Sequence, residues 1–340
     1  MATLTGRLRR RLLAPTEGDV TFAARGFPVT GGPAVRHLEA VPAAVVRGFR
    51  GTVDGSPLPQ VAARAAAEPD PLRGFHHEGA VMAACVVDAM DPRGGPRGGT
   101  RARDLLTGPA RDHVLLGWIG VGFALAKLPT AIWSRAVPDL DDVDHQAVLS
   151  ALAVDGWAFD LAFFDPPRWL GRQERLPSVP WRGDDAGVPR VADQGVGRAL
   201  WFFHGAEVPR VAAAVAAFAP DRHADLWAGV GLAATLAGGA SADDLRRLAA
   251  AGAPEDLALG AVLAARAAQD AAADTGTVPA HVTTGARALA GTSVPGGADL
   301  VTGLAPAPGA AGVPAYLDWR ARIRARLAAS PAVSPRVRAG

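Results

Sequence analysis

"WIGVGFALA" occupies residues 118–126, and nearly the same phrase, "WAGVGLAAT", returns at residues 227–235. Both are apolar, and both contain two glycines separated by one residue. The apolar stretches that hold them, 114–126 and 226–240, are shorter than the roughly 20 residues a membrane-spanning helix needs. We therefore expect two buried core helices and no transmembrane segment.

Other matches flank the two phrases and indicate an internal duplication. They occur in the same order in both halves: Glu78-Gly79 with Gln194-Gly195, His113 with His223, and Gly156 with Gly260. A repeated order with varying loop lengths is typical of a duplicated structural unit. Strand signals are few, because β-branched alternation is rare. We predict an all-α fold in which two pseudo-symmetric helical repeats enclose an apolar pocket, with few or no strands.

The predicted organisation is one compact domain made of four segments. These are an N-terminal segment (1–65), repeat one (66–170), repeat two (188–275), and a C-terminal helix and tail (276–340). Within the last segment, 291–314 resembles a Gly/Pro/Ala-rich linker, and 316–329 a short basic helix. Ser241 and Asp244 predict a capping box, and Pro209 suits the first turn of a helix.

Glycines inside the two repeated phrases need a physical reason, since each costs a helix about 1 kcal/mol relative to alanine. Two reasons are open: close approach of neighbouring helices, or room for a bulky apolar ligand.

Composition excludes several classes of protein. The 340 residues include one cysteine, Cys85, which excludes an intramolecular disulfide framework and favours a cytoplasmic location. The formal net charge is +2 and arginines are spread along the chain, so we expect no nucleic-acid partner. "GVGLAA" (229–234) lacks the strand that precedes a dinucleotide-binding loop. His76, His77 and Glu78 are adjacent and would diverge on a helix, so we expect neither a metal site nor a cofactor.

Acidic residues inside apolar helices are the best candidates for chemistry. Asp160 interrupts "WAFDLAFF" (157–164), and Glu78 opens another apolar run. Burial would raise the pKa of either carboxyl and make it a proton donor, although Asp160 could instead lie on an exposed helix face. Arg198 lies near Asp193 on a predicted helix and could pair with Asp193 or Glu78. The candidate catalytic residues are Asp160, Glu78, Asp193 and Arg198.

Aromatic side chains are expected to line the pocket, where their faces could stabilise a cationic intermediate. The candidate substrate-binding residues are Trp118, Trp157, Phe159, Gln194, Trp201, Trp227, His113 and His223. Asp139, Asp141 and Asp142 form the D-x-D-D pattern of class II terpene cyclases, in a stretch that also suits an ordinary acidic loop.

Several motifs carry a family resemblance. "DHVLLGWIGVGFALAKLP" (112–129), "ADQGVGRALWF" (192–202) and "RHADLWAGVGLAATLAGG" (222–239) resemble the UnbL-like domain-of-unknown-function family (domain of unknown function 1702) of actinobacterial enediyne gene clusters, over residues 7–329. The resemblance implies a role in natural-product biosynthesis near a polyketide synthase that makes a conjugated polyene, and it brings no established catalytic residues.

These observations lead to two functional hypotheses. The first is an enzyme of the cyclase, isomerase or lyase type that acts on a polyene or isoprenoid chain by general-acid catalysis, a terpene cyclase being one form of it. The second is a non-catalytic polyene-binding chaperone or synthase partner. The basic helix at 316–329 could contact a partner or acidic lipid, or simply form a solvated face.

Overall fold

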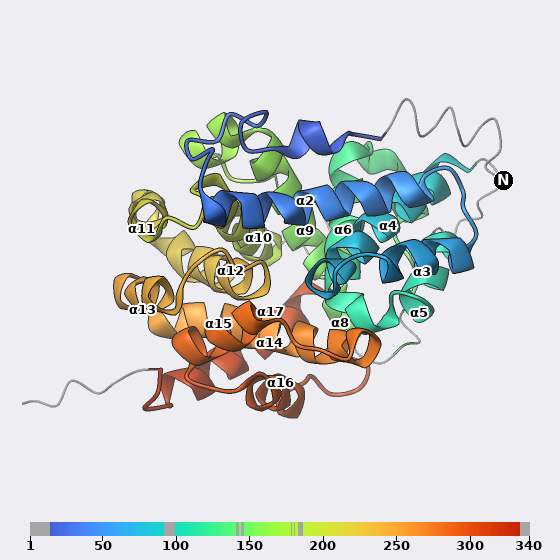
Figure 1. Ribbon diagram of the computed structural model, residues 1–340. Helices are drawn as coiled ribbons and strands as arrows, with labels where there is room; N and C mark the ends of the chain where they lie inside the picture. The colour runs from blue at the N-terminus through green and yellow to red at the C-terminus, as the bar shows by residue number, and fades with distance from the viewer. Residues whose placement is uncertain are drawn as a thin grey trace, which may run out of the picture.

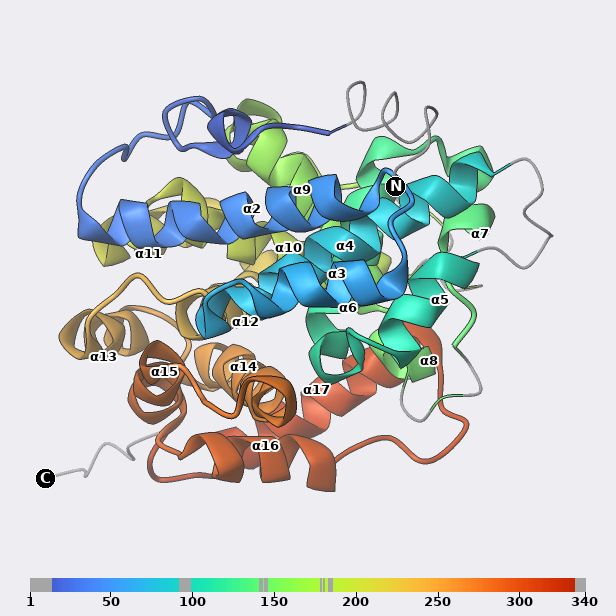
Figure 2. The same ribbon diagram turned by 45° about the vertical axis from the view of Figure 1, so that its right-hand side comes forward.

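The computed structural model describes residues 14–91, 99–140, 143, 146–177, 179, 181–182 and 186–333. Over these residues the protein has 16 α-helices and no strand, which confirms the predicted all-α class. The arrangement is shown in Figures 1 and 2.

Seven helices form a row in which each one packs against the next in chain order. They are α2 (Pro33–Thr52), α4 (Asp70–Met90), α6 (Val114–Lys127), α9 (Leu152–Phe164), α10 (Val188–Phe203), α12 (His223–Leu236) and α14 (Pro254–Thr275). The two repeated phrases form most of α6 and α12, whose interior residues are buried as predicted.

Glycines set the close spacing of this row. A Cβ on Gly120 of α6 would lie 2.2 Å from the carbonyl oxygen of Glu78 on α4. A Cβ on Gly229 of α12 would lie 1.9 Å from the carbonyl oxygen of Gln194 on α10. The same residue pairs that match in sequence thus make the same contact in both halves. Of the two reasons considered for these glycines, close helix approach is correct and room for a ligand is wrong.

The N-terminal segment, for which the sequence predicts no definite element, supplies α2 and α3 (Leu58–Ala66). α2, the first helix of the row, packs along α4 and extends past the other helices of the row in both views (Figures 1 and 2). At its start, a ring nitrogen of His37 lies 2.8 Å from the carbonyl oxygen of Ala237, just after α12. α2 therefore bridges the row from α4 to the end of α12.

The remaining helices surround the row: α5 (Thr100–Thr107), α7 (Trp133–Ala136), α8 (Gln146–Leu149), α11 (Val208–Ala217), α13 (Ala242–Ala251), α15 (Ala280–Ala290), α16 (Val294–Gly303) and α17 (Gly312–Ala328). The capping box of Ser241 and Asp244 begins α13, and Pro209 lies in the first turn of α11, as predicted. The predicted linker at 291–314 is wrong, because the Ser293 side chain accepts a hydrogen bond from the Gly296 amide and so starts α16.

The basic helix α17 is less solvated than its sequence suggests. It packs against α14 and α8, and the Arg320 side chain is buried in an ion pair with Asp225 at 2.8 Å. Arg324 pairs with Asp256. Arg320 at least is committed to the core and is not available to a partner or lipid surface.

One hydrophobic cluster connects buried residues from Val20 to Val333, so both proposed repeats share a core. Their boundaries, 66–170 and 188–275, stay a prediction. Among the described residues, the stretch Gln146–Phe164 alone is long and apolar enough to cross a membrane, and most of it is buried in the protein. Buried core helices of soluble proteins reach the same length and hydropathy.

Candidate functional site

A cavity of about 460 Å³ lies among α2, α4, α6, α9, α10 and α12. Its volume falls within the range of roughly 300–1,000 Å³ that is typical of small-molecule pockets. Seven phenylalanines from five helices line it: Phe49, Phe75, Phe123, Phe159, Phe163, Phe164 and Phe202. Phe159 stacks on Phe123, with ring centroids 5.6 Å apart, and meets Phe202 edge-on at 5.5 Å. The walls therefore suit an apolar ligand.

The cavity reaches the surface near the ends of α4 and α6. Met90, the last residue of α4, lines it and is 49% exposed. Lys127, the last residue of α6 and the sole lysine of the chain, also lines it and has a side chain that is 40% exposed. A hydrophobic ligand could enter between these two residues.

Glu78 is the carboxyl that stands out in the cavity. Phe75, Glu78, Met82 and Val86 recur every three or four residues along α4, so one face of the helix directs all of them into the cavity. Glu78 is 1% exposed, and its Oε1 has no hydrogen-bond partner. Burial raises the pKa of Glu78 to about 8, with Arg198 opposing the shift and Asp155 adding to it. This carboxyl is therefore protonated at neutral pH.

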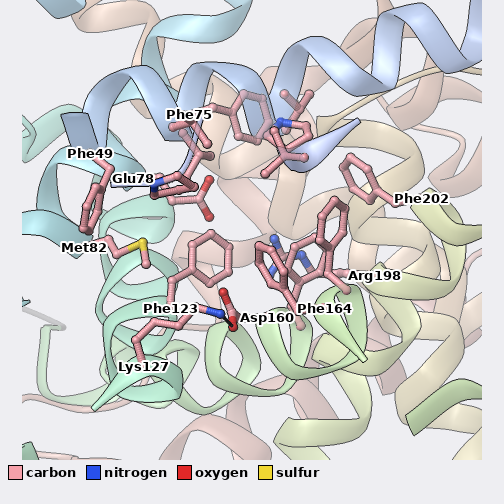
Figure 3. Close-up of a pocket in the computed structure, with 18 of the residues that line it drawn as sticks. Phe49, Phe75, Glu78, Met82, Phe123, Lys127, Asp160, Phe164, Arg198 and Phe202 are labelled. Atoms are coloured by element: carbon pink, nitrogen blue, oxygen red, sulfur yellow. Dashed lines mark hydrogen bonds and ion pairs between the residues drawn. The ribbon is translucent and has the colours of Figure 1, made fainter. Parts of the chain in front are cut away.

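Asp160 is also inside the cavity, which excludes the exposed position considered from the sequence. It is 4% exposed, and its Oδ2 accepts a hydrogen bond from the Lys127 ammonium at 2.5 Å. Burial raises the pKa of Asp160, while Lys127 lowers it. Figure 3 shows the carboxyls of Glu78 and Asp160 directed among the phenylalanine rings. Of the two, only Glu78 lacks a cationic partner in direct contact.

Arg198 lines the cavity but pairs with neither Glu78 nor Asp193, so that expectation is wrong. Its guanidinium donates to Asp155 of α9, which is fully buried. The pairing follows from the close packing of α9 on α10, where a Cβ on Gly195 would lie 2.1 Å from the Asp155 carbonyl oxygen. Arg198 also lies over the ring of Phe159, 4.6 Å from its centroid. The charge of Arg198 is thus neutralised within the cavity wall.

Gln194 supports this ion pair and does not line the cavity. Its Nε2 donates to Asp155 at 2.7 Å and lies 3.1 Å from the Tyr316 hydroxyl. Gln194 was predicted to contact substrate, but its side chain lies outside the cavity.

Asp193 is likewise placed away from the cavity. It lies five residues before Arg198, which on a helix of 3.6 residues per turn puts it on a different face. Its carboxylate pairs with Arg222 at 2.5 Å. Burial raises the pKa of Asp193, and the hydrogen bond from Arg222 opposes that shift. Asp193 therefore forms a buried ion pair outside the cavity, and its predicted catalytic role stays a prediction.

The tryptophans predicted to line the cavity pack elsewhere in the core, and of the predicted aromatic lining only Phe159 is present. The indole of Trp118 donates to Gln146 at 2.6 Å, and that of Trp201 donates to the Gly238 carbonyl oxygen at 2.9 Å. Trp157 packs edge-on against Trp133, and Trp227 lies against Gly252. Buried indole N–H groups usually find a hydrogen-bond acceptor, and Trp118 and Trp201 find theirs away from the cavity.

The two predicted histidines also lie outside the cavity. A ring nitrogen of His223 lies 2.7 Å from the Phe218 carbonyl oxygen. His113 lies against a separate hollow, with Nε2 3.0 Å from the Asp274 carboxylate. Of the D-x-D-D residues, Asp141 and Asp142 lie outside the described residues, and Asp139 does not line the cavity.

Several residues of the cavity wall were not predicted from the sequence. α2 contributes Val41, Val45 and Phe49, whose i, i+4, i+8 spacing is an amphipathic helix signal that the prolines nearby obscured. Asp155 gave no local sign that it would hold Arg198.

Comparison with known proteins identifies the family of the chain but assigns no activity to it. The sequence matches, over residues 4–327, the model of a family described as "Protein of unknown function (DUF1702)". No curated protein and no solved structure matches the chain.

Proposed function

Because the chain belongs to the family described as "Protein of unknown function (DUF1702)", we propose a function from the cavity itself: the protein isomerises or cyclises a long polyene or isoprenoid chain by proton transfer from Glu78. The observation that carries this proposal is the buried, protonated Glu78 carboxyl, which lacks a hydrogen-bond partner at Oε1 and opens on a phenylalanine-lined space.

The chemistry needs a proton donor and an environment that tolerates a carbocation. Glu78 transfers its proton to one carbon of a carbon–carbon double bond, which forms a C–H bond and leaves the positive charge on the neighbouring carbon. Loss of a proton from an adjacent carbon, back to the Glu78 carboxylate, moves the double bond. Attack by a second double bond before that loss closes a ring. Neither outcome adds or removes atoms overall.

Phenylalanine faces stabilise the charge along the way. The rings of Phe123, Phe159 and Phe202 meet at centroid distances of 5.5–5.6 Å and contain no nucleophile that could capture the cation. Arg198 holds Phe159 in place from one side. Its own charge is compensated by Asp155, so it does not oppose the carbocation as an isolated cation would.

The ion pair of Lys127 and Asp160 lies at the mouth and has a different role in this proposal. The Lys127 ammonium lies 4.0 Å from the centroid of the Phe164 ring and covers the solvent side of that ring. This pair closes the cavity behind an apolar chain and could contact a polar end group. Asp160 is therefore a positioning residue, not the acid.

The proposed biological context comes from the resemblance to proteins of enediyne gene clusters. A conjugated polyene released by a polyketide synthase is apolar and reacts with acid, which matches the phenylalanine lining and the buried Glu78 carboxyl. A prenyl-derived chain is the other substrate class that fits.

Deuterium labelling tests the proposal directly. Purified protein is incubated in D₂O with a conjugated polyene or with geranylgeraniol, and the recovered compound is analysed by mass spectrometry. Acid catalysis places deuterium on carbon and changes the absorption spectrum of the polyene. Glu78→Gln should abolish both effects while ligand still binds, and Asp160→Asn should retain labelling. Recovery of unlabelled, unchanged ligand from the wild type would instead support the chaperone hypothesis.

A further inference from the structure

His77, His113 and Asp274 form a second cluster of functional groups, separate from the large cavity. His77 comes from α4, His113 from the short helix η2 (Arg111–His113), and Asp274 from the end of α14. One ligand atom from each side chain lies within 4.8 Å of the other two. None of the three lines the large cavity, although Phe75 and Leu236 line both it and the hollow beside His113.

The two imidazoles are held rigidly. His77 is 2% exposed and His113 4%, and their rings stack with centroids 4.9 Å apart. The ring of His113 packs closely against α4 at Gly74, where a Cβ would lie 3.0 Å from its Nδ1. Asp274 approaches the same ring at 3.0 Å. Ligands that are already immobile lose little conformational freedom when an ion binds.

An unsatisfied ring nitrogen is the second, independent observation. Nδ1 of His77 is buried and has no hydrogen-bond partner, while His113 faces Asp274 through Nε2. Burying a polar atom without a partner costs free energy, so this nitrogen, on the ring stacked against His113, calls for a ligand.

We propose that His77, His113 and Asp274 bind one divalent transition-metal ion, of the zinc or cobalt type. Imidazole nitrogen with one carboxylate is a donor set that these ions prefer, whereas Mg²⁺ and Ca²⁺ prefer oxygen ligands throughout. His76, the neighbour of His77, is not part of this group: adjacent residues on a helix diverge, and its Nδ1 lies 3.1 Å from Glu68.

The site has a route to solvent and an open coordination position. His113 lines a hollow of about 50 Å³ together with Asp70, Asp270 and Thr275, and the Asp274 side chain is 32% exposed. Three protein ligands leave a fourth position on a tetrahedral ion, which a water molecule or small ligand would take from this hollow.

Arg73 competes with the ion for the same carboxylate. Its guanidinium lies 3.4 Å from Asp274 Oδ2 and also pairs with Asp70 at 2.8 Å. Like charges repel, so the metal must coexist with this cation or displace it toward Asp70. Arg73→Gln should therefore tighten metal binding.

The experiment uses the whole chain freed of metal with EDTA and titrated with CoCl₂, followed by visible absorption, and then with ZnCl₂ in competition. The wild type should bind one equivalent of Co²⁺, displaced by Zn²⁺. Asp274→Asn and His113→Asn should each weaken binding at least tenfold. Asp270→Asn is the matched control, because Asp270 borders the same hollow but pairs with Arg266, and it should bind like the wild type.

Circular dichroism shows whether each variant is folded, and either ligand variant alone suffices for the test. Absence of stoichiometric Co²⁺ and Zn²⁺ binding by the folded wild type would overturn the proposal. Equal weakening by Asp270→Asn would overturn it too, since that indicates diffuse attraction to acidic groups. Neither result bears on Glu78, so the metal site and the proposed acid catalysis succeed or fail separately.

Discussion

Replacing Glu78 by glutamine should stabilise the protein, and the gain should increase with pH. In the native state burial raises the pKa of Glu78 to about 8, whereas the ordinary value is 4.5. Between these two pH values the unfolded chain releases the Glu78 proton while the native protein keeps it. The unfolded state then binds fewer protons, so the free energy of unfolding falls as pH rises.

The magnitude follows from the distance between the two pKa values. Over the range where only the unfolded state ionises, the loss is about 1.4 kcal/mol per pH unit. Between pH 5 and pH 7.5 it amounts to roughly 3 kcal/mol. Glutamine does not titrate, so Glu78→Gln escapes this loss and gains on the wild type by that amount.

Urea unfolding at pH 5, 6, 7 and 7.5, followed by tryptophan fluorescence, measures the effect. Contributions of all other titrating groups cancel in the difference between wild type and variant at each pH. Asp299→Asn, at an exposed position, controls for a general effect of removing one carboxylate. A difference between Glu78→Gln and the wild type that stays constant with pH would refute the assignment of a protonated, buried Glu78.

Helix packing and the site give three further predictions. Gly120→Ala should lower the free energy of unfolding by about 3 kcal/mol or more in the same urea assay, because the new Cβ meets the Glu78 carbonyl oxygen. Its control is Gly303→Ala, which has open space around it and should change the free energy of unfolding by less than about 1 kcal/mol. Asp155→Asn should destabilise by about 3–5 kcal/mol, since it leaves the buried Arg198 without its counter-ion, and thermal unfolding by circular dichroism would measure this. Deuterium incorporation by the wild type should decline as pH rises through about 8, where Glu78 loses its proton; a rate that keeps rising above pH 9 would contradict its role as the acid.

The helical class, and the correspondence between helices of the two halves, can be predicted from the sequence alone. The glycines of the two repeated phrases sit where helix backbones touch, and that requirement is local enough to leave a mark in the sequence. The apolar runs around Glu78 and Asp160 also made both carboxyls candidates for burial, but only the packing of the helices decided between a buried and an exposed Asp160.

Which side chains meet depends on the packing of the whole chain. Spacing along one helix gives the face on which Arg198 lies, but not that α9 would present Asp155 to it. Tryptophan and phenylalanine look alike as apolar aromatics in sequence, yet the indole N–H usually pairs with an acceptor, and Trp118 and Trp201 find theirs in Gln146 and Gly238, away from the cavity. His113 and Asp274 are 161 residues apart, and contacts at that separation depend on how all the intervening helices pack.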